Sequence, residues 1–189
     1  MKNDLTQELL NNNASNACIV FSDGQCLWGK GFGHEGIKVA EICFNTAMTG
    51  YQEILTDLSY AGQIINFTFP HIGNTGTNVN DNESNSAAAL GMITRNMPTK
   101  PSHWQTEKTF DDWLKKNKVV GIGNIDTRKV THIIRSGGAQ MVTICYSKSG
   151  GINIAKLKEL TSNAVGLEGK ELTADVTCLE SFSWQKPQK

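Results

Sequence analysis

Short apolar runs and alternating apolar and polar residues fill the first half of the chain, and both patterns are typical of β-strands. Strands are predicted over 17–21, 25–32, 37–44, 63–69 and 90–94. Between the first two, Asp23-Gly24 supplies the positive φ angles of a tight turn, so these strands are expected to form a hairpin. Pro70 ends the fourth strand, because proline cannot donate to a ladder.

Helical signals follow after residue 108. Thr109 is predicted to cap a helix over 110–117, and Asp126 a second helix over 127–136 that ends at Gly137-Gly138. Predicted strands flank the second helix at 119–125 and 140–146. These signals together predict a strand–helix–strand unit.

The pattern divides the chain into three parts. Residues 1–16 are Asn-rich and aperiodic, with one short helix expected over 5–10, and are predicted to be a flexible N-terminus. Residues 17–150 hold the predicted strands and most of the helices, which is enough for one well-buried domain. Residues 151–189 carry one further helical signal, at 154–160, and are predicted to be an irregular extension or linker.

Composition excludes several classes of protein. Eighteen Lys and Arg residues balance eighteen Asp and Glu residues, so no basic field is available to bind nucleic acid. No apolar run is long enough to span a membrane, and the start lacks the features of a signal peptide, so a soluble cytoplasmic protein is expected. The five cysteines are odd in number and none has the spacing of zinc ligands, which predicts reduced thiols and no metal site.

The stretch 31–36 reads G-x-G-x-x-G, the spacing of a dinucleotide-binding loop. That loop works only when a helix follows, because the helix N-terminus holds the pyrophosphate. Here a β-branched strand is predicted to follow. The chain also lacks a G-x-x-x-x-G-K-S/T phosphate loop, so no cofactor is expected in this chain.

Catalytic constellations are absent from the sequence. No cysteine or serine lies in a G-x-C-x-G or G-x-S-x-G elbow, and none of the four histidines is followed two places later by a carboxylate. We therefore predict no catalytic residue. His71 has two open interpretations, positioning a partner or satisfying its own loop, and the basic residues of helix 127–136 are either solvated or a docking surface.

Residues 44–53, with their continuation 66–74, form the most unusual stretch. The run is too polar for a core strand, too poor in charge for a solvated surface and wrongly spaced for an amphipathic helix. A pocket wall or interface and an ordinary surface loop both remain open on these grounds. Residues 73–89 follow with so many turn formers that backbone conformation must be what they supply.

The stretches 44–53, 69–78 and 125–131, the last running into 137–139, closely resemble the N-terminal domain of the small, glutamine-using subunit of carbamoyl-phosphate synthase. The agreement spans about residues 20–146 in order. The resemblance implies an α/β fold, a three-layer β/β/α sandwich of the swivelling type with an irregular C-terminal extension. It also implies a ligase partner, the large subunit, on which this domain docks to form a heterodimer.

In that family the C-terminal half of the small subunit is a class I glutamine amidotransferase with a Cys-His-Glu triad. Glutamine is hydrolysed there, and ammonia passes through a tunnel to the large subunit, where ATP, Mg and bicarbonate are used to make carbamoyl phosphate for arginine and pyrimidine biosynthesis. The present sequence stops, after a linker-like stretch at 174–184, where that half is expected to begin. The resemblance thus implies that the chain alone is inactive.

The resemblance also implies a role for three residues of the stretch 44–53. Ala47, Met48 and Thr49 are expected to form one wall of the glutamine site, and Ala47 stands where some family members carry a serine whose hydroxyl reaches the glutamine. The alternative function is a stand-alone protein-interaction module that keeps this fold without catalysis.

Overall fold

The computed structural model describes residues 15–178, 180, 181 and 183. The helix predicted over 5–10 lies outside these residues. The described strands are β1 (Ala17–Phe21), β2 (Cys26–Gly33), β3 (Gly36–Asn45), β4 (Gln63–Phe67), β5 (Gly91–Ile93), β6 (Val120–Gly123) and β7 (Gln140–Tyr146). The helices are α2 (Tyr51–Thr56), the 3₁₀ turn η1 (Leu58–Tyr60), α3 (Phe110–Lys116), α4 (Thr127–Gly137), α5 (Ile154–Ser162) and α6 (Thr173–Val176).

The strands form a closed barrel in the order β1-β2-β6-β5-β4-β3-β7, and β7 pairs with β1. Pairing is parallel from β3 through β4 and β5 to β6, and antiparallel elsewhere. The mixed α/β class predicted from the sequence is confirmed. The strands close on themselves in a barrel, and the finer expectation of three stacked layers stays a prediction.

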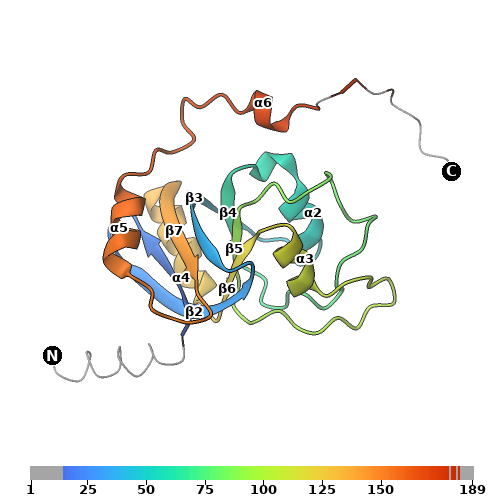
Figure 1. Ribbon diagram of the computed structural model, residues 1–189, viewed down its shortest axis with the longest axis horizontal. Helices are drawn as coiled ribbons and strands as arrows, with labels where there is room; N and C mark the ends of the chain where they lie inside the picture. Colours follow the sequence, from blue (N-terminus) through green and yellow to red (C-terminus); the bar gives the residue numbers. More distant parts are fainter. Residues whose placement is uncertain (1–14, 179, 182, 184–189) are drawn as a thin grey trace.

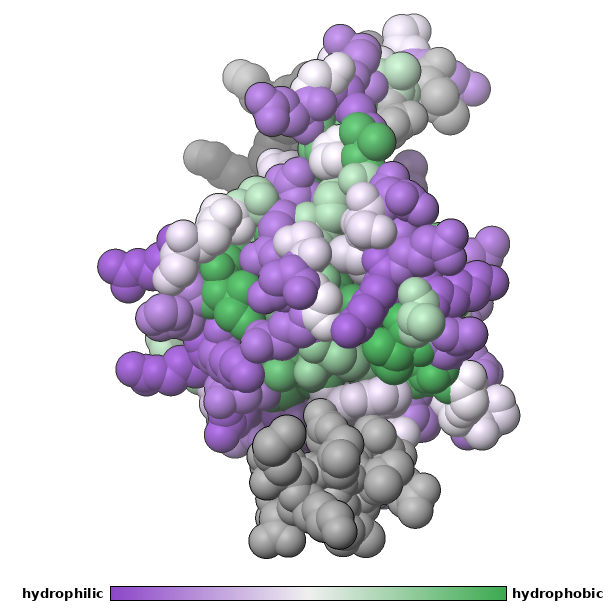
Figure 2. All heavy atoms as spheres, turned by 90° about the vertical axis from the view of Figure 1, so that its left-hand side faces the viewer, coloured by the Kyte–Doolittle hydropathy of each residue, from purple (hydrophilic) through white to green (hydrophobic). Residues whose placement is uncertain are grey.

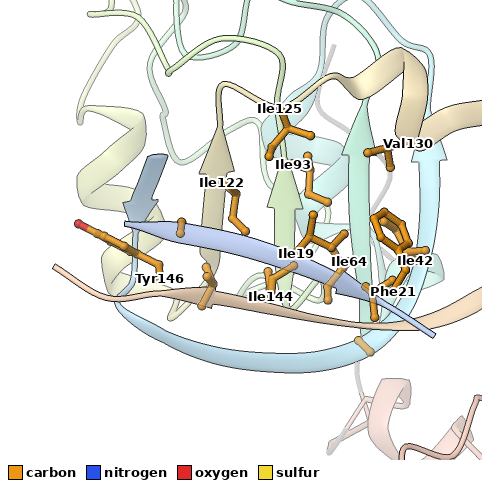
Figure 3. Close-up of a cluster of buried hydrophobic side chains, with 14 of the residues drawn as sticks. Ile19, Phe21, Ile42, Ile64, Ile93, Ile122, Ile125, Val130, Ile144 and Tyr146 are labelled. Atoms are coloured by element: carbon orange, nitrogen blue, oxygen red, sulfur yellow. The ribbon is translucent and has the colours of Figure 1, made fainter. Parts of the chain in front are cut away.

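The barrel interior is the main core. Alternate strand residues point to the same face, so one set of branched side chains fills the inside of the barrel. Ile19, Ile64, Ile122 and Ile144 are completely buried there, with Val130 of α4 packing at one end (Figure 3). Burying each such side chain contributes about 1.5–3 kcal/mol.

Two further apolar clusters attach helices to the outside of the barrel. One joins α2 and α3 to β4 and β5 and includes Leu55, Phe67, Met92 and Leu114. The other places α5 over β1 and β7 through Cys18, Val20, Cys145 and Leu157. The two sets of helices therefore lie on different sides of the barrel, as Figure 1 shows.

The predicted helix caps are present. The Thr109 hydroxyl accepts from the Asp112 amide at 3.2 Å, and Asp126 Oδ1 accepts from the Lys129 amide at 3.1 Å. Gly138 ends α4 with a φ of 78°. These local signals determine where the helices begin and end, because each cap satisfies an amide that the helix itself leaves without a partner.

Asn66 ties the barrel to α4. It is fully buried on β4, and its Nδ2 donates to the Thr127 carbonyl at 3.1 Å and to Thr131 Oγ1 at 2.9 Å. Its Oδ1 has no hydrogen-bond partner among the described residues. Two donated bonds thus join β4 to α4, while the unpaired buried oxygen costs about 1–3 kcal/mol.

The glycine-rich stretch 31–36 connects two strands. Gly31 and Gly33 belong to β2, and Gly36 begins β3, so a strand follows the glycines, as the sequence predicted. The first turn of α3 contacts this stretch through Asp111, whose Oδ1 accepts from the Gly33 amide at 2.6 Å, but that helix does not follow the glycines in the chain as a dinucleotide-binding loop requires. The interpretation as a dinucleotide site is thereby rejected.

After α5 the chain crosses the outer face of the barrel and leads away toward α6 (Figure 1). The Leu167 amide donates to Glu41 Oε2 of β3 at 3.2 Å, which attaches this segment to the barrel. In the described part of the chain, no helix has the length and apolar character needed to cross a membrane.

Candidate functional site

The unusual stretch divides into the end of β3, an exposed loop over 46–50 and the helix α2. The helix corrects the sequence analysis, which found the spacing unsuited to an amphipathic helix. With six residues, α2 is too short to show a helical period, and a helix of this length has little stability of its own. Gly50 begins it with a φ of 78°, a conformation that glycine adopts without strain.

Tyr51 anchors the start of α2. Its ring packs against Phe110 with the ring centroids 4.6 Å apart. Its hydroxyl donates to the Gly76 carbonyl at 2.8 Å and accepts from the Thr75 hydroxyl at 2.7 Å. One side chain thus joins the core to the loop that begins at residue 75.

Gln52 is 2% exposed and binds the same loop further along. Its Nε2 donates to the Asn78 carbonyl at 2.6 Å and to Asn82 Oδ1 at 2.7 Å, and its Oε1 accepts from the Asn78 amide at 3.1 Å. The side-chain amide therefore pairs with the Asn78 backbone in both directions, as a neighbouring strand would.

Thr56 completes the attachment. Its hydroxyl donates to the Gln52 carbonyl at 2.9 Å and accepts from the Glu83 amide at 2.9 Å, while Ser84 Oγ donates to the Thr56 carbonyl at 2.6 Å. Residues 75–84, which we name the clamped loop, are thus held by three side chains of α2. Buried backbone groups need such partners when no strand or helix supplies them.

A pocket of about 220 Å³ lies between α2 and the loops around it. Thr49, Gly50 and Glu53 line it on one side, and Thr75, Asp81 and His103 on the other. Burial raises the pKa of the Glu53 carboxyl, and the nearby charges of Asp81 and Glu83 raise it further. The pocket is therefore polar, with an excess of acidic groups.

Of the three residues predicted for the glutamine wall, only Thr49 lines this pocket. Ala47, Met48 and Thr49 are all exposed on the loop, and Met48 is 70% exposed. The Ala47 amide donates to Asn45 Oδ1 at 2.7 Å, which fixes the beginning of the loop. The structure places the three side by side on the surface, and their role in binding glutamine stays a prediction.

Three exposed apolar residues are next in sequence to residues that line the pocket. Besides Met48, the neighbouring loops carry Val79, 69% exposed, and Trp104, 84% exposed. Large exposed side chains of this kind are enriched where proteins bind one another. By contrast, the face over α5 is a mosaic in which hydrophilic residues separate small hydrophobic groups (Figure 2).

The basic side chains of α4 lie beside another surface pocket. Arg128, Lys129 and His132 line it together with Asp23 of the first hairpin. His71 is exposed, and its ring packs edge-on against Phe69 with the centroids 5.8 Å apart. The basic residues of α4 are still either solvated or a docking surface. His71 still either positions a partner or satisfies its own loop.

The buried thiols are poor nucleophiles. Burial raises the pKa of Cys43 to about 11. It also raises the pKa of Cys145, and contact with Cys26 together with burial raises that of Cys18 strongly. Thiols held protonated in this way behave as small hydrophobic residues. Within the described residues, no group of His, Cys, Asp and Glu could hold a metal ion.

Comparison with known proteins identifies the family. Residues 19–144 match the model of the carbamoyl-phosphate synthase small chain, CPSase domain. The small chain of Ruegeria pomeroyi is 46% identical over 170 residues, which cover 90% of this chain and 44% of that protein. The small chain of Zymomonas mobilis is 46% identical over 168 residues, or 89% and 45% of the two chains. This chain belongs to the carbamoyl-phosphate synthase small chain family.

The chain spans less than half the length of these two relatives. Among solved structures, an aminopeptidase from Aneurinibacillus matches 69% of this chain and 30% of its own at 13% identity and a TM-score of 0.40. A likeness that weak adds nothing about fold or function.

Sequence reasoning missed the residues that organise the site. Tyr51, Gln52 and Thr56 were not singled out individually, although they lie within or just beyond the unusual stretch 44–53. The available signal was a glutamine and a threonine four residues apart, followed by a loop rich in turn formers. Side chains at this spacing lie on one helix face and can bind one segment.

Proposed function

We propose that this chain is the N-terminal domain of the small, glutaminase subunit of carbamoyl-phosphate synthase, and that it docks on the large subunit and forms one wall of the glutamine site. The observation that carries the proposal is the family match over residues 19–144, with 46% identity to a small chain over 170 residues. The exposed loop over 46–50, beside a polar pocket, supports the part that concerns glutamine.

In this function the domain performs no bond-making step. Glutamine reaches it through the amidotransferase domain of the complete small subunit, and ATP and Mg act in the large subunit. The overall reaction is that of a cytoplasmic ligase, which supplies carbamoyl phosphate to arginine and pyrimidine biosynthesis. We expect the three-layer β/β/α arrangement of the family to describe this domain.

The surface around α2 is suited to a partner. Val79 and Trp104 expose apolar side chains to water, and their burial on docking would be favourable at roughly 25 cal/mol per Å². A rigid loop is also better suited to a binding wall than a mobile one, because less entropy is lost when the ligand binds. The clamped loop is hydrogen-bonded to α2, and the loop over 46–50 runs into this helix, so these bonds restrict the motion of the proposed wall.

The experiment is Ala47→Trp in the complete enzyme, assayed with glutamine and with free ammonia. Ala47 is exposed, so the larger ring can be accommodated without disturbing the fold. We expect KM for glutamine to rise strongly and synthesis from ammonia to stay intact, because ammonia does not use the glutamine pocket. Equal losses with both nitrogen donors would show that the loop serves folding or subunit docking instead.

A further inference from the structure

We infer that Gln52 is a positioning residue for the glutamine-facing loop, acting through the clamped loop 75–84. The inference rests on the proposed function of Ala47, Met48 and Thr49. It adds a residue that is 2% exposed and that, although it lines the pocket, makes its side-chain hydrogen bonds to the clamped loop. Gln52 acts by holding α2 in place, and the loop over 46–50 runs directly into this helix.

The geometry shows what Gln52 holds. Its amide makes three hydrogen bonds to Asn78 and Asn82, two of them donated by Nε2. Asn78 in turn organises the rest of the clamped loop, since its Oδ1 accepts from the Asn80 and Asp81 amides at 2.9 and 3.1 Å. Loss of the Gln52 amide would therefore release a connected set of contacts.

The position of the loop over 46–50 depends on these contacts. The loop runs directly into α2, where the Ile54 amide donates to the Gly50 carbonyl at 2.9 Å. A helix of six residues is stable only when tertiary contacts support it. Because Gln52 supplies such contacts on the side of the clamped loop, it holds Thr49 and the pocket edge in place.

Gln52 is better suited to a test than its neighbours on α2. Tyr51 packs in the core against Phe110, so replacing it would disturb folding. Gln52→Glu keeps the shape and the acceptor for the Asn78 amide but removes both donors. The new carboxylate would also face two acceptor oxygens, the Asn78 carbonyl and Asn82 Oδ1.

Lowering the pH should partly restore the lost hydrogen bond in Gln52→Glu. When the new carboxyl is protonated, its O–H can again donate to the Asn78 carbonyl. Its charged neighbours are Glu53 on the same helix, Asp81 and Glu83 on the clamped loop, and His103 on the facing loop. Burial and the three carboxylates favour the protonated form, so the defect should shrink as pH falls.

The first measurement is hydrogen exchange of the 189-residue chain over residues 76–84, at about pH 8 and about pH 5 relative to wild type at the same pH. Gln52→Glu should speed exchange about tenfold at the higher pH, the effect expected from losing two hydrogen bonds, and less at the lower pH. Gln52→Met, which keeps the length without the amide, should speed exchange equally at both. Gln25→Glu, which adds the same charge on the exposed hairpin turn, should leave residues 76–84 unchanged.

The second measurement is steady-state kinetics of the complete enzyme. Gln52→Glu and Gln52→Met should raise KM for glutamine about fivefold or more while the ammonia-dependent rate is kept, and only Gln52→Glu should recover at lower pH. If hydrogen exchange over residues 76–84 does not change, the inference is overturned. It is also overturned if the activity with glutamine and the activity with ammonia fall by the same factor. If Ala47→Trp impairs glutamine use and the Gln52 variants do not, the proposed function stands and the inference alone fails.

Discussion

The aromatic ring of Tyr146 lies against Gly31 so closely that a methyl carbon built on this glycine would stand 1.9 Å from ring atom Cδ2. Gly31 lies on β2 and Tyr146 on β7, the two strands on either side of β1. The hydroxyl of Tyr146 points away from the interior cluster (Figure 3). The first glycine of the G-x-G-x-x-G stretch is therefore required by packing inside the barrel.

Gly31→Ala should destabilise the chain by about 1–3 kcal/mol, the usual cost of overpacking a core. Urea unfolding followed by circular dichroism measures the difference. Gly137→Ala is the matched control, because its nearest neighbour, Gln140 Nε2, lies at 3.7 Å and it ends a helix in which alanine is favoured. Equal stability of Gly31→Ala and wild type would contradict this account of the glycine.

Glu53→Gln should stabilise the chain at neutral pH. The pKa of Glu53 is raised by burial, so the native state binds its proton more tightly than the unfolded state does. Stability therefore falls as pH rises past the ordinary carboxyl range, and the neutral amide avoids that loss. The advantage of Glu53→Gln should vanish below about pH 4, where both states are protonated.

Urea midpoints at about pH 3.5 and about pH 7 decide the matter, with Glu168→Gln as the control on an exposed carboxylate. A Glu53→Gln variant less stable than wild type at neutral pH would mean that the carboxylate is stabilised by its surroundings. The acidic character assigned to the pocket would then be wrong.

Ala47→Ser in the complete enzyme should lower KM for glutamine about two- to twelvefold, the effect of one added hydrogen bond. The kcat should change little, because a contact made equally with substrate and transition state is uniform binding. Steady-state kinetics with glutamine measures both constants. A large rise in kcat at constant KM would show that the hydroxyl acts only in the transition state.

The 189-residue chain by itself should show no glutaminase activity. The prediction rests on the missing nucleophile elbow and on thiols whose pKa is raised by burial. The measurement is glutamate release from glutamine by the purified chain. Turnover that survives replacement of all five cysteines would contradict it.

The sequence was a good guide where structure is decided locally. The strands predicted over 17–21 and 140–146 have the bounds of β1 and β7, because each is an apolar run between turn formers. The caps at Thr109 and Asp126 were also predicted correctly. In these cases neighbouring residues in the sequence supply the hydrogen bonds that define the element.

The closure of the barrel could not be predicted from local sequence signals. It depends on pairings such as Ala17 with Tyr146 and Gly31 with Ile122, which join residues far apart in the sequence. Helix α2 was missed for the same reason, since its partners in the clamped loop begin more than twenty residues later. The motif resemblance gave the family, but not the contacts of Gln52.

The central claim is that this chain is the docking domain of the small subunit, and direct binding to a matching large subunit tests it best. Isothermal titration of the purified 189-residue chain into the large subunit from the same source is the measurement. We predict saturable binding at an equimolar ratio, with a negative heat-capacity change because apolar side chains such as Val79 and Trp104 become buried. A chain that unfolds cooperatively in urea, and is therefore folded, yet gives no binding heat at any temperature and no complex in size-exclusion chromatography would contradict the claim.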